Sequence, residues 1–167
     1  MSFPILMWSP FDSGGCIGEQ GGPGLGGHQG PKWYIRYGMD LKARAGTPVY
    51  AAFDGYVTKP TVEGHSAHEY GNQIFVRSHN HMMGCFYTHI KGPKFPQNHI
   101  FTMGDPLGVV MIDHLHMAIV EIIGGWPSND YKGVNIFKPS FLDMCLRNGY
   151  LNVTFYQNHS PPFAAPA

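Results

Sequence analysis

The fold class is clearest in the segment HLHMAIVEII, residues 114–123. Its apolar residues alternate, which is typical of a β-strand with one buried face. His114 and His116 lie two positions apart, so their imidazoles point to the same face of such a strand. Ala118 and Val120 continue that face, and the histidine pair therefore lies where an apolar sheet surface ends. The pair is either part of a functional site or two buried histidines satisfied by hydrogen bonds.

Further short strands are predicted before this segment. Residues 73–78 alternate, and residues 85–89 form a second short apolar run. Residues 49–53 and 56–58 flank an Asp-Gly pair, which is typical of the turn between two hairpin strands. The sequence therefore predicts a mostly β, antiparallel domain.

The composition divides the chain into three parts. Residues 1–32 are predicted to be a glycine-rich N-terminal arm, in which residues 11–32 hold too many glycines for a helix and form a long loop. Residues 33–126 hold the predicted strands and form the expected domain. Residues 127–167 are predicted to be a C-terminal extension, with one short helix over 138–147 and a proline-rich tail.

Length and charge limit the possible functions. At 167 residues the chain is long enough for one domain with a sizeable core. Eleven basic side chains balance eleven acidic ones, and only 13% of residues are charged, which argues against binding to nucleic acid. No apolar run approaches the ~20 residues that span a bilayer, and no targeting signal is evident. Cys16, Cys85 and Cys145 form no CxxC pair, so we expect reduced thiols in a protein made in a cytoplasm.

Several motifs follow one another between residues 38 and 116. They are Gly38-Met39-Asp40, residues 46–57 (GTPVYAAFDGYV), Tyr70-Gly71-Asn72, Tyr87-Thr88-His89, Met103-Gly104-Asp105 and His114-Leu115-His116. In this order they resemble peptidase family M23, the zinc peptidases of LytM and lysostaphin type that cleave peptidoglycan peptides. The resemblance implies a curved antiparallel sheet of the duplicated hybrid-motif type, with long loops and a groove across one face.

The resemblance also assigns roles to four residues. Asp40 and His116 match two of the family's three zinc ligands. His89 and His114 match the two histidines that help to activate the attacking water and to stabilise the oxyanion. Three protein ligands leave one zinc position open for chemistry. We predict that these four side chains converge in one pocket, with His89 on the same strand face as Tyr87.

Arg36 stands at the position where the family has its first zinc-binding histidine. A guanidinium stays protonated and offers no lone pair to a metal. Arg36 is therefore predicted either to pair with Asp40 and take the place of the cation, or to face solvent. His28 on the arm or Asp113 is the alternative third ligand, although neither has the family's spacing. The segment before His114 is also shorter than in the family, which predicts a lower groove wall.

Two functions follow from these features. We favour a metal-degenerate M23-like protein, without a cofactor, that serves as a structural or wall-contacting part of a phage tail or a related injection machine. Its partners are then other assembly subunits or peptidoglycan. The alternative is an active zinc metalloendopeptidase that hydrolyses peptide bonds of peptidoglycan. The metal content of the purified protein distinguishes the two functions.

Overall fold

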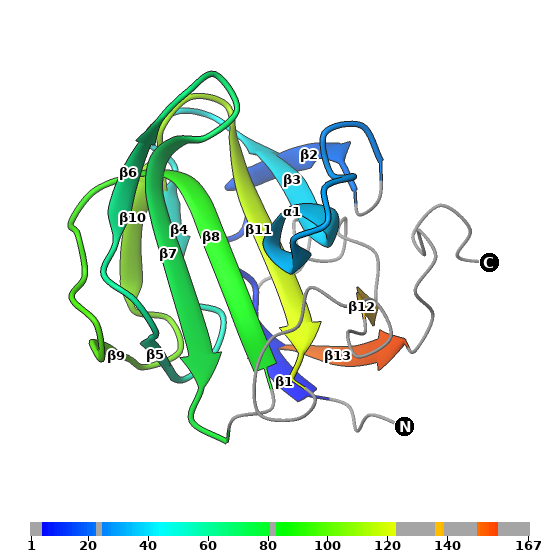
Figure 1. The fold of residues 1–167 in the computed structure, drawn as a ribbon, viewed down its shortest axis with the longest axis vertical. Coiled ribbons are helices and arrows are strands. Elements are labelled where there is room, and N and C mark those ends of the chain that lie inside the picture. Colours follow the sequence, from blue (N-terminus) through cyan, green and yellow to red (C-terminus); the bar gives the residue numbers. More distant parts are fainter. Residues whose placement is uncertain (1–4, 23–24, 81–82, 123–135, 139–149, 157–167) are drawn as a thin grey trace.

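The computed structural model describes residues 5–22, 25–80, 83–122, 136–138 and 150–156 (Figure 1). These residues form a 13-stranded sheet, in which the paired strands are antiparallel, and one helix of four residues. In chain order the elements are β1 (Ile5–Trp8), β2 (Cys16–Gly21), α1 (Trp33–Arg36), β3 (Gly38–Ala43), β4 (Pro48–Tyr50), β5 (Gly55–Val57), β6 (Val62–His65), β7 (Tyr70–Ser78), β8 (Met83–Lys91), β9 (Ile100–Phe101), β10 (Pro106–Val110), β11 (His114–Glu121), β12 (Ile136–Lys138) and β13 (Tyr150–Tyr156). The predicted mostly β, antiparallel fold is confirmed.

The central strands bring distant residues together. β7, β8, β11, β3 and β2 lie side by side in that order. The register between β11 and β3 places His116 directly opposite Asp40, and the register between β11 and β8 places His116 opposite Thr88. Residues that lie directly opposite in an antiparallel pair have neighbouring side chains on one face of the sheet. Asp40 and His116 therefore meet although they are far apart in the sequence.

The sheet buries apolar side chains on both faces. Leu115, Met117 and Ile119 of β11 belong to the large core on one face. Because side chains alternate along a strand, the residues between them belong to the other face. There a smaller cluster consists of Trp33, Tyr37, Phe75, Phe86, Ala118 and Val120. His114 and His116 share this second face, on which α1 lies (Figure 1).

The hairpin predicted over residues 49–58 is wrong. β4 pairs with β10, and β5 pairs with β7 and β9. The connection between β4 and β5 bonds to a distant loop instead, because Ala51 N donates to Asp105 O and Gly104 N donates to Ala51 O. Long-range strand pairing thus overrides the local turn signal.

The predicted N-terminal arm contains two strands, β1 and β2, and the expectation of a long loop is wrong for residues 16–21. β2 pairs with β3 through register shifts between Cys16 and Gly18 and between Glu19 and Gly21. Glycine permits such irregularity, and Gly18 has a φ of +152°, which other residues rarely adopt. The boundaries of the three predicted parts stay predictions.

Two further expectations concern the helix and the cysteines. Residues 139–147 of the predicted C-terminal helix lie outside the described residues, and Lys138 ends β12.

Cys16 is disulfide-bonded, whereas Cys85 is a buried free thiol. The prediction of reduced thiols is therefore wrong for Cys16 and confirmed for Cys85. A disulfide requires only closeness in space, which the absence of a CxxC pair does not exclude.

Among the described residues, no helix has the length and the apolar character needed to cross a membrane.

Candidate metal centre

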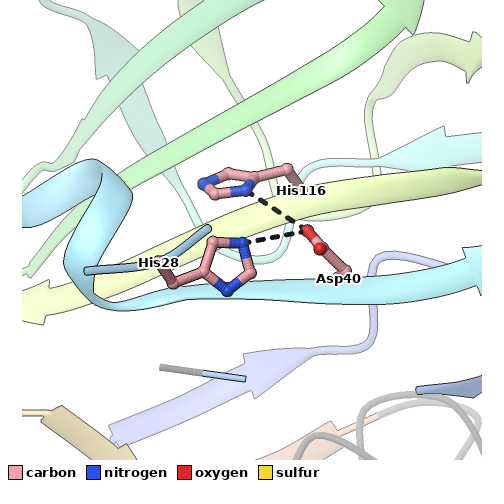
Figure 2. Close-up of side chains that lie close together, drawn as sticks. All are labelled: His28, Asp40 and His116. Atoms are coloured by element: carbon pink, nitrogen blue, oxygen red, sulfur yellow. Dashed lines mark ion pairs between the residues drawn. The ribbon is translucent and has the colours of Figure 1, made fainter. Parts of the chain in front are cut away.

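Three side chains from separate parts of the chain converge on the second face of the sheet (Figure 2). His28 comes from the loop after β2, Asp40 from β3 and His116 from β11. One ligand atom of each lies within 4.8 Å of the other two. His28 Nε2 is 3.2 Å and His116 Nδ1 is 3.3 Å from Asp40 Oδ1. Both histidines are buried and Asp40 is half-buried.

The backbone after β2 delivers His28 to this point. Leu25 N donates to Gly22 O, and His28 N donates to Leu25 O, so the loop turns back towards the sheet. Gly21 ends β2 opposite Asp40, and a Cβ there would lie 3.3 Å from Asp40 Oδ2 and 3.7 Å from His28 Cε1. The missing side chain at Gly21 therefore lets the end of β2 approach the carboxylate closely.

Backbone carbonyls hold both imidazoles on the side away from Asp40. His28 Nδ1 is 3.0 Å from Gly22 O, and His116 Nε2 is 2.8 Å from Tyr34 O. A carbonyl oxygen only accepts hydrogen bonds, so in each neutral ring this nitrogen carries the proton. The nitrogen that faces Asp40 then presents a lone pair. Metal-ligating histidines usually donate their other ring N–H in this way.

The lone pairs of His28 Nε2 and His116 Nδ1 face the Asp40 Oδ1 atom. Asp40 Oδ1 is buried and has no hydrogen-bond partner in the described part of the chain, although three ring nitrogens lie within 3.6 Å. Burial opposes ionisation of this carboxyl, but His116 and His28 outweigh burial and hold the pKa of Asp40 well below its usual range. Burial likewise lowers the pKa of His28, yet the neighbouring carboxylate raises it overall.

The donor set therefore fits a divalent metal ion. A carboxylate oxygen and two imidazole lone pairs repel one another unless a cation lies between them. Two histidines and one aspartate are a donor set that zinc accepts, and three protein ligands leave one tetrahedral position open. The pKa of Asp40 is lowered and that of His28 is raised because the carboxylate and the imidazole each stabilise the charged form of the other.

A cavity of about 810 Å³ opens at the three residues. Asp40, His89, His114 and His116 all line it, together with His28. The predicted convergence of the first four in one pocket is confirmed, whereas their chemical roles stay predictions. The remaining walls come from the end of β2 and the loop after it, from α1, from the loop between β6 and β7, and from residues of β7 and β8.

His89 reaches the cavity through a β-bulge. Asn72 of β7 lies opposite Ile90 but Ile74 lies opposite Tyr87, so β8 contains one extra residue here. His89 adopts a positive φ of 67° at this irregularity. Tyr87 belongs to the large core, whereas His89 lines the cavity. The prediction that these two side chains share a strand face is therefore wrong, because the extra residue breaks the alternation.

His89 is held as a neutral imidazole. Its Nδ1 is 2.9 Å from Tyr70 O, and the Tyr70 ring stacks on it at 4.0 Å between centroids. Burial, together with His116 and His114, lowers the pKa of His89 to about 4 against the effect of the Tyr70 carbonyl. Because Nδ1 donates to that carbonyl, Nε2 carries the lone pair.

His114 lies beside His89, with the two ring centroids 4.8 Å apart. Its Nε2 is 3.6 Å from Asp40 Oδ1, and its Nδ1 is 2.7 Å from Asp113 Oδ1. Asp113 thus contacts His114 and does not belong to the group of three candidate metal ligands. Of the two alternative third ligands, the structure brings His28 to the centre.

Arg36 is the last residue of α1, and it is not among the described residues that line the cavity. Asp40 Oδ1 lies 3.2 Å, 3.6 Å and 3.3 Å from ring nitrogens of His28, His114 and His116, respectively. Sequence reasoning missed His28 as the main choice because no motif spacing marks it. Its only local signal is a histidine at the end of a glycine-rich stretch, and the pairing of β2 with β3 then carries it to Asp40.

Comparisons with known proteins give a family and a fold. The profile of Peptidase family M23 matches residues 34–129, a range that contains Asp40, His89, His114 and His116 but not His28. A zinc containing peptidase from Vibrio cholerae, solved by crystallography, is 16% identical with a TM-score of 0.51, and the match covers 69% of this chain and 37% of that one. Lysostaphin, solved by NMR, is 23% identical with a TM-score of 0.44, covering 69% and 49%. This chain thus spans less than half the length of either protein. Comparison with the curated proteins gives no match.

Proposed function

Because the chain belongs to peptidase family M23, whose profile matches residues 34–129, we propose that it is a zinc metallopeptidase with His28, Asp40 and His116 as its ligands. One observation carries the proposal: the buried Asp40 Oδ1 faces two imidazole lone pairs and has no hydrogen-bond partner among the described residues. His28 then supplies the third donor that Arg36 cannot supply.

The two other histidines of the cavity suit proton transfer. Zinc, when bound, supplies a Lewis acid that polarises a peptide carbonyl and makes a water more acidic. His89 is neutral with its lone pair on Nε2, so it can accept the proton of an attacking water. His114 lies 4.8 Å away between ring centroids and shares the same space. The imidazole that takes the proton of the water on its Nε2 becomes a cation, which can stabilise the oxyanion and then pass that same proton to the leaving amine.

The proposed substrates are the peptides of peptidoglycan, the substrate class that the family resemblance implies. The cavity of about 810 Å³ has room for a peptide segment rather than for a single side chain. Tyr34, Ile35 and Phe86 provide apolar lining, and Gln73 and Thr88 provide polar groups. This mixture suits a peptide, whose backbone needs hydrogen bonds and whose side chains need apolar contacts.

The rival function is a metal-free structural component of a phage tail or an injection machine. The sequence favours that function because only Asp40 and His116 occupy the family's ligand positions. With His28 beside Asp40, three ligand atoms are present, and the reason for preferring a degenerate site is removed. A folded chain that purifies without zinc would make the structural role the better interpretation.

Zinc content and peptide hydrolysis together test the proposal. We expect the full chain, purified without chelators, to hold about one zinc and to release amino groups from purified peptidoglycan. EDTA should abolish the activity and added zinc should restore it. His28→Ala should weaken zinc binding at least about hundredfold, or about 2.7 kcal/mol, because a direct ligand is lost. Competition with a chelating dye measures the affinity.

Two further variants sharpen the result. His68→Ala is the matched control, because His68 lines the same cavity but is not one of the three candidate ligands; its zinc affinity should stay within twofold of the parent. Arg36→His in the His28→Ala background should not restore binding, because position 36 does not line the cavity in the described part of the chain. Unchanged zinc affinity in His28→Ala would refute the ligand assignment.

A further inference from the structure

Asp113 makes a short contact with the cavity histidine that follows it in the chain. Its Oδ1 is 2.7 Å from His114 Nδ1, a hydrogen-bond distance, whereas His114 Nε2 is 3.6 Å from Asp40 Oδ1. The His114 side chain is 13% exposed and that of Asp113 is 54% exposed. The carboxylate therefore binds the imidazole from the solvent side, while Asp40 lies on the inner side.

The backbone around Asp113 is anchored at both ends. Ala43 N donates to Asp113 O, which ties this residue to the end of β3. Met111 N donates to His89 O, so the preceding loop is tied to the strand that carries the other cavity histidine. These bonds fix the position of the Asp113 main chain relative to both imidazoles. The carboxylate is thus held next to Nδ1 by the fold and not by its own side-chain contact alone.

The contact determines which His114 nitrogen carries the proton. A carboxylate only accepts hydrogen bonds, so Nδ1 must be the donor in the neutral ring. Nε2 then has the lone pair, on the side of Asp40 and the cavity. Without Asp113, the described part of the chain offers no other hydrogen-bond partner to Nδ1, and a neutral imidazole that lacks such a partner favours the Nε2–H tautomer. That tautomer has no lone pair towards the cavity.

We propose that Asp113 is a positioning residue that holds His114 in the Nδ1–H tautomer and so keeps Nε2 free to accept a proton at the reaction site. The inference rests on the proposed peptidase function for its kinetic consequence, but not for the tautomer. Contacts with neighbouring rings fix the ring plane as well, since His89 lies edge-on at 4.8 Å and Tyr70 edge-on at 6.3 Å. These ring contacts do not determine which His114 nitrogen carries the proton, whereas the hydrogen bond to Asp113 does.

The test combines NMR of the histidine nitrogens with kinetics on the zinc-loaded full chain. Long-range ¹H–¹⁵N spectra should show His114 as the Nδ1–H tautomer in the parent and mainly as the Nε2–H tautomer in Asp113→Ala. The kcat for peptide hydrolysis should fall at least about tenfold in Asp113→Ala, with KM and zinc content within twofold of the parent. Asp113→Asn keeps an acceptor oxygen without the charge, so its tautomer ratio and its kcat should lie between those of the parent and Asp113→Ala.

Asp12→Ala is the matched control. Asp12 is also exposed and also accepts one side-chain hydrogen bond, from Tyr50 Oη at 3.0 Å, but it does not line the cavity. Its variant should leave the His114 tautomer and kcat unchanged. An unchanged tautomer in Asp113→Ala overturns the proposal, and if that variant does not fold, an unchanged tautomer in Asp113→Asn does so. A parent chain that hydrolyses no peptide refutes the peptidase function instead, and the NMR result still decides the role of Asp113.

Discussion

At Gly38, next to the candidate metal centre, the structure leaves no room for a side chain. A Cβ at Gly38 would overlap the imidazole of His116, with Cε1 and Nε2 as the nearest atoms. We expect Gly38→Ala to push the ring away from Asp40 and to lower zinc affinity at least about tenfold. The overpacking should also lower the free energy of unfolding by about 1–3 kcal/mol. Zinc titration and urea unfolding in EDTA measure the two effects separately.

Gly27→Ala is the matched control for Gly38→Ala. Gly27 also lines the cavity, but a Cβ there meets no atom within 4 Å. Its zinc affinity should stay within twofold of the parent. Parental zinc binding by Gly38→Ala would show that His116 has room to move and still reach the metal.

The residues of the site differ in how far the sequence predicts them. Asp40, His89, His114 and His116 could be predicted because each belongs to a motif whose order along the chain is informative. His28 could be named only as an alternative. Its approach to Asp40 depends on β2 pairing with β3 and on the turn that follows Gly21, and both are tertiary features that no local pattern encodes.

At the scale of elements, the bulge in β8 determines where His89 points. The extra residue opposite β7 reverses the alternation after Tyr87, which belongs to the large core. The sequence predicts the strand but not the bulge, because an apolar run carries no mark of an extra residue. The hairpin expected over residues 49–58 fails for a related reason, since partners distant in sequence determine the pairing of β4 and β5.

The bulge also makes a prediction about stability. His89 has a φ of 67°, where a residue with a Cβ is strained and glycine is not. His89→Gly should therefore be more stable than His89→Ala by about 1 kcal/mol, although both variants remove the imidazole. Urea unfolding of the two variants gives the difference directly.

Thr88 supplies the control pair for His89. Thr88 is the neighbouring β8 residue and is not among the described residues with positive φ. There the order should reverse, and Thr88→Gly should be less stable than Thr88→Ala by about 0.5–1 kcal/mol. The same order at both positions would mean that His89 does not adopt the left-handed conformation in solution.

At the scale of the whole molecule, the proposed ligands join three segments that are remote in sequence. His28 follows β2, Asp40 lies in β3 and His116 lies in β11. The family profile matches residues 34–129 and so excludes the segment that carries His28. A metal bound at this point would therefore link the N-terminal segment to the sheet, in addition to any role in chemistry.

This linkage predicts that zinc stabilises the folded chain through His28. A ligand at about 100 times its Kd adds about 2.7 kcal/mol to the free energy of unfolding, which for a chain of this size corresponds to a rise of roughly 5–10 °C in Tm. We expect this rise in the parent, its loss in EDTA, and a much smaller rise in His28→Ala at the same zinc concentration. His68→Ala should keep the parental rise, because His68 lines the cavity without belonging to the candidate ligand group. Hydrogen exchange should slow on zinc addition at residues 25–28, since His28 is then held to the sheet by the metal as well as by Gly22 O. A zinc-induced rise in Tm that is as large in His28→Ala as in the parent would place the metal elsewhere.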